Sequence, residues 1–159
     1  MIHGAKNSAL ESVGAFTSPA GGATSPARIE ANRLYFEMIT EGTVYAPDQD
    51  TLHGVGTIFV HQPGESTVFR SPRDAHYACM TARFYLSRIS VRVKWPRHFF
   101  WDDPRSVLGF GEEMIFAFHH AGVDSGLLGD LILSQFRFRL EHFQRQTGSR
   151  NIPPRLAGV

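Results

Sequence analysis

Residues 56–67 have the sequence GTIFVHQPGEST, and this stretch decides the fold. Its first half is mostly β-branched or aromatic, which is typical of a buried strand. Pro63 and Gly64 then predict a sharp turn, because proline stiffens the approach and glycine tolerates the positive φ that such turns need. Thr67 begins another run with β texture. The stretch therefore predicts two strands joined by a tight turn.

Similar short runs surround this unit along the chain. We expect strands over residues 32–40, 56–61, 67–70, 75–86 and 89–94, with turns at 47–50 and 71–74. The segments between them are too short to hold the crossover helices that parallel strands require. Short strands at regular spacing therefore predict a sandwich or a barrel rather than a parallel sheet.

The pattern changes after Trp95-Pro96, where two helices are predicted. The first runs over about residues 111–120, and the second starts after Asp124 or Ser125 and ends near Gln146, with Gly148 as the stop. Apolar residues fall four apart on one face of the second helix, which we expect to pack on the barrel: Leu128, Ile132, Phe136 and Leu140. A second stripe either pairs two copies of the chain or is simply internal, and gives the candidate dimer interface: Leu127, Leu131, Ser134 and Phe138.

The two ends of the chain differ from its centre. Residues 1–27 are rich in Gly, Ala, Ser and Pro, which predicts a flexible arm, or else an arm that folds over the domain with Val13 and Phe16 as anchors. The N-terminal part has no long apolar run, so we expect neither a signal peptide nor a membrane span, and a cytoplasmic protein. Residues 149–159 are interpreted as a linker.

Composition narrows the class of protein. The chain has 159 residues, which suits one compact domain, and 42% of them are hydrophobic. The formal net charge of +1 argues against a chain that binds nucleic acid strongly by itself. Cys79 is the single cysteine, so the sequence allows neither an internal disulfide nor a cysteine-based zinc site.

Several motifs in one order resemble the N-terminal cupin-like ligand-binding and dimerisation domain of AraC-type transcription regulators. They are Glu41-Gly42, residues 56–60 and 62–67, Ala82-Arg83-Phe84 and Trp95-Pro96. The resemblance covers about residues 28–155. It implies a mainly β fold with α, in which a cupin-like barrel (a double-stranded β-helix or jelly roll) at 28–108 is followed by two C-terminal helices, a dimerisation region at 109–148.

The same resemblance implies a function. The barrel would bind a small polar effector such as a sugar, the chain would form a homodimer, and the linker at 149–159 would lead to a helix-turn-helix domain outside this chain. DNA would be bound only through that further domain, and no membrane is involved.

One departure from cupins bears on catalysis. Metal-binding cupins carry a His-x-His pair and a Glu on one strand and a further His after the Pro-Gly turn. Here residues 28–41 contain no histidine, and Thr67 stands after the turn. Since a metal site needs three or more converging ligands, we expect no metal, no cofactor and no enzymatic activity. The alternative, a stand-alone cupin-type enzyme or carbohydrate isomerase, predicts a bound metal.

Strand alternation suggests where a ligand would bind. It places Arg33, Tyr35, Glu37, Ile39 and Glu41 on one face and Leu34, Phe36 and Met38 on the other. The mixed face suits a pocket with polar groups and aromatic surface. With residues from facing strands, the candidate ligand-binding set is Arg33, Tyr35, Glu37, Glu41, Thr67, Phe69, Tyr77 and Arg83. In the alternative reading, this face is solvent-exposed or satisfied by pairs such as Arg33 with Glu37, and the domain serves pairing without a ligand.

Overall fold

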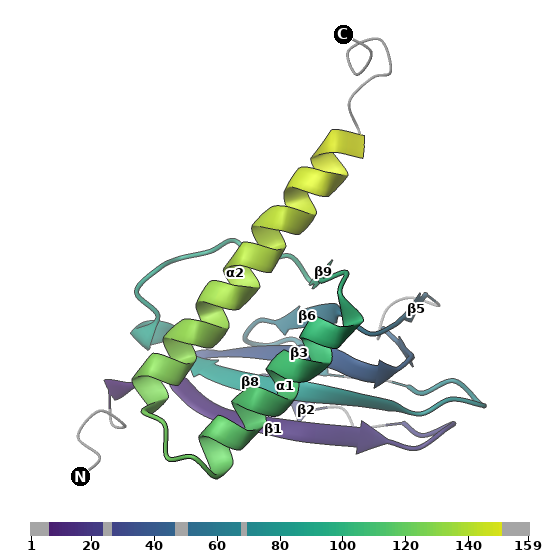
Figure 1. Ribbon diagram of the computed structural model, residues 1–159, viewed down its shortest axis with the longest axis horizontal. Coiled ribbons are helices and arrows are strands. Elements are labelled where there is room, and N and C mark those ends of the chain that lie inside the picture. The colour runs from purple at the N-terminus through teal and green to yellow at the C-terminus, as the bar shows by residue number, and fades with distance from the viewer. Residues whose placement is uncertain (1–6, 24–26, 47–50, 68–69, 151–159) are drawn as a thin grey trace, which may run out of the picture.

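The computed structural model describes residues 7–23, 27–46, 51–67 and 70–150 (Figure 1). Its largest unit is a five-stranded sheet with the order β1-β8-β3-β6-β9 and antiparallel pairing throughout. These strands are β1 (Leu10–Ser18), β3 (Arg33–Gly42), β6 (Thr57–His61), β8 (Tyr77–Tyr85) and β9 (His98–Phe100). Two small two-stranded sheets pair β2 (Ala27–Arg28) with β7 (Ser66–Thr67), and β4 (Val44–Tyr45) with β5 (Leu52–His53).

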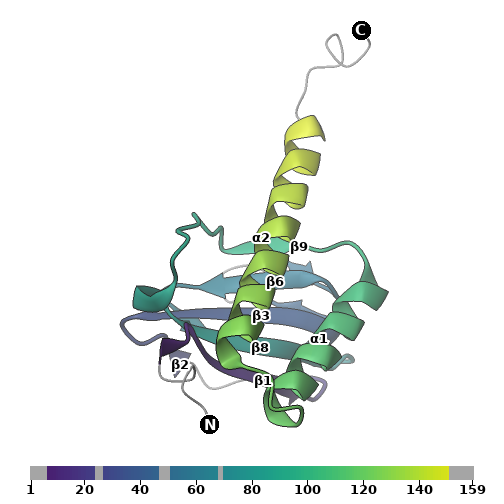
Figure 2. The same ribbon diagram turned by 60° about the vertical axis from the view of Figure 1, so that its left-hand side comes forward.

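Two helices cover one face of the large sheet (Figures 1 and 2). They are α1 (Pro104–His119) and α2 (Ser125–Arg150), and the far end of α2 runs beyond the sheet. The main core lies between helices and sheet, and Phe136 of α2 sits at its centre against Phe36, Phe99 and Phe110. No helix in the described part of the chain is long and apolar enough to cross a membrane.

The opposite face of the sheet holds a second, smaller core. Its buried members are Ile39, Val44, Phe59, Tyr77 and Cys79. In β3, Ile39 belongs to this small core, whereas Leu34, Phe36 and Met38 belong to the main one. The alternation predicted for this strand is therefore confirmed as far as Ile39.

Both helices are longer than predicted. The sequence predicts α1 from about residue 111, but the helix begins at Pro104. Asp103 caps it by accepting a hydrogen bond from the Ser106 backbone N–H at 3.3 Å, and proline fits the first helical position because it has no N–H to satisfy. In α2, Asp124 accepts from the Leu127 N–H at 2.9 Å, and the helix continues past Gly148 to Arg150.

The prediction of a flexible arm over residues 1–27 is wrong for Leu10–Ser18. This segment is β1, an edge strand paired with β8 from Leu10 opposite Phe84 to Ser18 opposite Tyr77. A register irregularity between Leu10 and Ser12 breaks the two-residue period, so Leu10 and Val13 both enter the main core although they lie three positions apart. Val13 is an anchor, as the alternative interpretation expected.

The strand predicted over residues 89–94 is also wrong. The chain leaves β8 through a 3₁₀ turn, η2 (Leu86–Arg88), and then runs as an irregular segment to β9. No sheet edge is free beside β8, because β1 and β3 flank it on both sides. Ile89 and Val93 instead pack against the main core as part of a loop.

Candidate ligand-binding cleft

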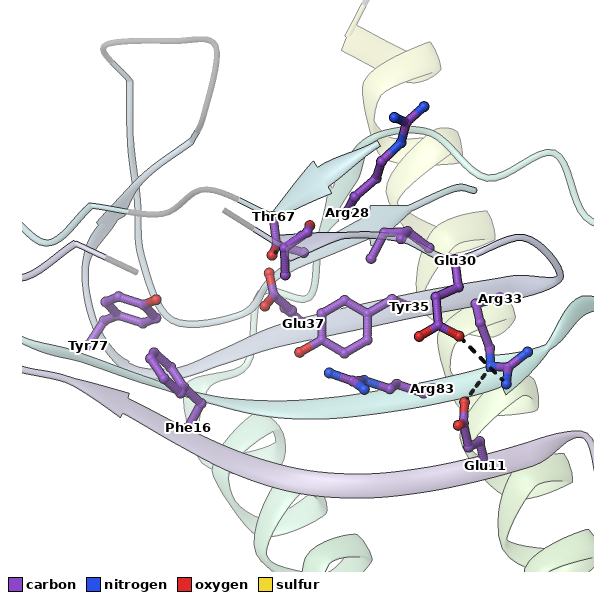
Figure 3. Close-up of a pocket in the computed structure, with 12 residues that line it drawn as sticks. Glu11, Phe16, Arg28, Glu30, Arg33, Tyr35, Glu37, Thr67, Tyr77 and Arg83 are labelled. Carbon is purple, nitrogen blue, oxygen red and sulfur yellow. Dashed lines mark hydrogen bonds and ion pairs between the residues drawn. The ribbon is translucent and has the colours of Figure 1, made fainter. Parts of the chain in front are cut away.

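A cleft of about 320 Å³ lies on the sheet face opposite the helices (Figure 3). Its floor comes from β1, β8 and β3, and its roof from the β2–β7 pair and the residues that follow β2. Backbone hydrogen bonds fix this roof, since the Ile29 N–H donates to the Glu65 carbonyl at 2.8 Å and the Gly64 N–H donates to the Ile29 carbonyl at 2.9 Å. The lining residues are Glu11, Phe16, Ala27, Arg28, Ile29, Glu30, Arg33, Tyr35, Glu37, Thr67, Tyr77 and Arg83.

Six of the eight residues named from the sequence line this cleft: Arg33, Tyr35, Glu37, Thr67, Tyr77 and Arg83. Glu41 does not, because β3 has a register irregularity between Ile39 and Glu41. Its carboxylate lies at the surface, 3.0 Å from His76 Nε2. Phe69 lies outside the described residues. The sheet register thus brings most of the predicted set together and turns Glu41 away.

Glu37 and His61 form a buried pair beside the cleft. The Glu37 carboxylate lies 2.9 Å from His61 Nε2, and the two side chains are 10% and 7% exposed. The His61 ring also stacks on Tyr35, with the ring centroids 5.8 Å apart. Glu37 therefore has a fixed partner behind it while it lines the cleft, and this partner is not the Arg33 that the sequence suggested.

Arg33 forms ion pairs with two other carboxylates, and these pairs close one end of the cleft. Its Nε lies 2.7 Å from Glu11 of β1, and its guanidinium lies 3.9 Å from Glu30 (Figure 3). The guanidinium also lies 4.1 Å from the centre of the Tyr85 ring. This network ties β1 and the segment after β2 to β3.

The tyrosine hydroxyls of the cleft remain protonated. Burial raises the pKa of Tyr35, and the nearby Glu37 charge raises it further, while Arg83 partly offsets both. Burial also raises the pKa of Tyr77, and of Cys79 beneath the cleft. Both phenols therefore present neutral hydroxyls that can donate and accept hydrogen bonds.

An aromatic wall faces these polar groups. Phe16 of β1 and Tyr77 of β8 lie with their ring centroids 5.9 Å apart. In Figure 3 they stand at one end of the cleft, across from Tyr35, Glu37 and Arg83. The cleft thus combines charged, hydroxyl and aromatic groups, which is the mixture that small-molecule sites use to orient and cover a ligand.

Several lining residues were missed from the sequence. Glu11 and Phe16 belong to β1, and Ala27, Arg28, Ile29 and Glu30 form the roof. The sequence did single out Phe16, but only as an anchor of an arm over the domain. Among the described residues, no group of three or more His, Cys, Asp and Glu side chains could hold a metal ion.

Solved structures share this architecture. ToxT from Vibrio cholerae strain SCE256, an AraC-family regulator bound to an unsaturated fatty acid, matches with a TM-score of 0.54 at 6% identity, over 82% of this chain and 55% of ToxT. ToxT from Vibrio cholerae O395, bound to (E)-4-(8-methylnaphthalen-1-yl)but-3-enoic acid, matches with a TM-score of 0.54 at 7% identity, over 83% and 57%.

The fold is of the cupin type, mainly β with two C-terminal helices. The chain spans just over half the length of ToxT. At such low identity the likeness concerns the fold alone. No family model and no curated protein matches the sequence.

The expectation that the chain has no enzymatic activity was wrong as a conclusion from the sequence. The matching structures include a predicted oxalate decarboxylase from Thermotoga maritima, with a TM-score of 0.41 at 14% identity over 49% of this chain and 69% of that one. They also include the polyketide cyclase RemF from Streptomyces resistomycificus, with a TM-score of 0.38 at 16% identity over 73% and 70%. Missing metal ligands bear on metal chemistry only, so they were too narrow a basis for excluding catalysis.

Proposed function

We propose that the chain is a cytoplasmic effector-binding and dimerisation domain of an AraC-type regulator, which holds a small polar organic molecule in the cleft. The observation that carries this proposal is the convergence of Arg33, Tyr35, Glu37, Thr67, Tyr77 and Arg83 on one cleft of about 320 Å³. The two ToxT structures support it, because a protein of the same fold binds small organic molecules.

Ligand binding in this cleft would act on the N-terminal strand. Phe16 and Glu11 of β1 line the cleft, and Val13 of the same strand enters the main core beneath the helices. His119 of α1 also contacts β1, with its Nε2 2.7 Å from the Val13 carbonyl oxygen. Ligand contact with β1 could therefore change how the sheet and the helices pack. The ligand would shift the protein toward the conformation to which it binds more tightly.

The exposed stripe of α2 is the proposed pairing surface. Leu127, Leu131 and Phe138 are 64%, 47% and 58% exposed, and Ser134 lies between them on the same side of the helix. The residues that hold α2 on the sheet are a different set: Leu128, Ile132, Phe136 and Leu140. Because apolar side chains gather on the free side of α2, this helix suits a homodimer contact. DNA would be contacted by a helix-turn-helix domain that follows α2.

A thermal-shift screen of sugars and small acids tests the ligand proposal. A molecule that binds only the folded state raises the unfolding temperature, and saturation at 100 times the Kd adds about 2.7 kcal/mol of stability. Ala27 is exposed and lines the cleft, so Ala27→Trp should fill the space and abolish the shift. Ala121→Trp, at an exposed position between the helices, is the matched control. A shift that survives in Ala27→Trp would place the ligand elsewhere.

A second candidate function is catalysis in the same cleft. The Glu37–His61 pair favours it, because a carboxylate backed by an imidazole can accept a proton from a bound substrate and pass it on. Mass spectrometry of a ligand incubated with the protein separates the two functions. A receptor returns the ligand unchanged, whereas an enzyme converts it over many turnovers, and Glu37→Gln then abolishes the conversion.

A further inference from the structure

We infer that the cleft selects an organic acid with one carboxylate and one hydroxyl group, with Arg83 binding the carboxylate and Glu37 accepting from the hydroxyl. This inference rests on the proposed function, because it names the class of molecule that the same cleft takes.

The charges of the lining residues are the first argument. Glu11 and Glu30 both lie against Arg33, and Glu37 lies against His61. Each carboxylate of the cleft therefore has a cationic or hydrogen-bonding partner. Arg83 has no carboxylate partner in the described part of the chain, so its charge is available to an anion that enters the cleft.

The position of Arg83 is the second argument. In the sheet, Arg83 of β8 is directly opposite Tyr35 of β3, and its guanidinium lies 4.9 Å from the centre of the Tyr35 ring. The ring thus holds the guanidinium beside it through a cation–π contact. Arg83 also forms a side-chain hydrogen bond with Tyr35, which uses part of its donor set. Its remaining N–H groups can donate to a carboxylate, the group that the planar fork of arginine suits best.

The placement of Glu37 supplies the second half of the specificity. Figure 3 shows the Tyr35 hydroxyl between the Glu37 carboxylate and the Arg83 guanidinium. A ligand that spans these groups meets a cation at one side and an anion at the other. Because Glu37 is buried and accepts hydrogen bonds, it favours a donor such as a hydroxyl and repels a second carboxylate. Hydroxy acids therefore fit, and dicarboxylates do not.

Isothermal titration of the whole chain with matched probes tests this inference. The probes are 4-hydroxyphenylacetate, 4-hydroxybutanoate and gluconate, each compared with its primary amide, and phenylacetate and succinate serve as further comparisons. We expect each acid that binds to do so about tenfold or more tightly than its amide, since a hydrogen bond to a charged group contributes that much. Arg83→Gln should bring the ratio close to one, while Arg105→Gln, an equal charge change on the helix side of the sheet, should leave it unchanged.

The outcomes separate this inference from the proposed function. If amides bind as tightly as acids, or if Arg83→Gln keeps the preference, the acid class is wrong and the cleft is still a ligand site. The same holds if succinate binds as tightly as 4-hydroxybutanoate, or if phenylacetate binds as tightly as 4-hydroxyphenylacetate. If no acid and no amide binds, the inference fails, and the proposed function fails with it if the thermal-shift screen of sugars and small acids also finds no ligand.

Discussion

The Glu37 carboxylate and the His61 imidazole meet at 2.9 Å inside the protein, with side chains only 10% and 7% exposed. Glu41 and His76 meet at a similar 3.0 Å, but their side chains are 64% and 51% exposed. The two pairs have the same chemistry and differ in burial, so they form a matched test of what burial adds.

We expect Glu37→Ala to lower the free energy of unfolding by about 1–3 kcal/mol, because His61 keeps a buried polar ring without this partner. Glu41→Ala should cost less than about 1 kcal/mol, because water screens and replaces the exposed pair. Urea denaturation of both variants measures the difference. Equal losses would mean that the buried pair contributes nothing beyond a surface contact.

The aromatic core gives a second prediction. Phe136 is fully buried among Phe36, Phe99 and Phe110, so Phe136→Ala should cost about 3–5 kcal/mol in unfolding free energy. Phe116, on the neighbouring helix α1, is 60% exposed, and Phe116→Ala should change stability by no more than about 0.5 kcal/mol. Thermal or urea unfolding of the pair measures both. A small cost at Phe136 would contradict the placement of α2 on the sheet.

Gly56 marks a close approach of two strand ends. Its φ is +97°, and a side chain there would collide with the Trp101 carbonyl. The Trp101 backbone N–H donates a hydrogen bond to the Gly56 carbonyl at 2.9 Å, so the two segments cannot easily move apart. Gly56→Ala should therefore destabilise the fold by about 2 kcal/mol or more. Gly54→Ala is the control, since nothing lies within 4 Å of its added carbon. If both variants unfold at the same denaturant concentration, β6 and β9 do not meet as described.

Acid should weaken the fold through a histidine pair. His53 and His98 are in ring contact at 4.9 Å, and burial lowers the pKa of both, with the His98 charge lowering that of His53 further. Their folded-state pKa values thus lie below the ordinary value of 6.5, so the unfolded chain binds more protons around and below that pH. The stability that the neutral rings contribute is present above pH 6.5 and is lost as the pH falls through the lowered values.

Urea unfolding of His53→Phe at pH 7.5 and 5.5 measures this effect. The variant should lose less stability on acidification than the wild type, by under about 1 kcal/mol because His53 is only partly buried. His142→Phe, at an exposed position on α2, should behave as the wild type does. A wild-type pH dependence that His53→Phe leaves intact would assign the effect to other groups.

Charged substitutions on the pairing surface should convert dimers into monomers, which halves the mass of the assembly. Leu131→Asp or Phe138→Asp places a charge in the exposed stripe of α2 and should weaken a dimer about 30-fold or more. Gln144→Asp adds the same charge to an exposed position of the same helix outside the stripe. Sedimentation velocity should find monomers for the first two variants and dimers for the third. Dimers that survive both stripe variants would place the contact on another face.

The sequence predicted those strands and helices in which apolar residues recur at one constant spacing. Alternation in β3 correctly separated Leu34, Phe36 and Met38 from Tyr35 and Glu37, and four-residue spacing identified the buried face of α2. It failed at Glu41, which stands next to a register irregularity in β3. An added residue in a strand moves the side chains that follow it to the opposite face of the sheet. Where such a residue occurs depends on the neighbouring strand rather than on the local sequence.

The site was predictable in part for a related reason. Arg33, Tyr35 and Glu37 belong to a single strand, so the two-residue alternation of that strand predicts that they share a face. The partners that fix them come from elsewhere in the chain: His61 from β6, Glu11 from β1 and Arg83 from β8. The free charge of Arg83 depends on how all these pairs are distributed, and only the three-dimensional arrangement reveals it.

The edge position of β1 has a consequence for how the chain folds during synthesis. β1 leaves the ribosome well before its sheet neighbour β8, since Leu10 is opposite Phe84. Strand β1 therefore cannot pair until β8 has been synthesised. Pairings between residues so distant in sequence are slow to form, so strand β1 and the cleft wall it carries should be late to gain protection from hydrogen exchange during refolding.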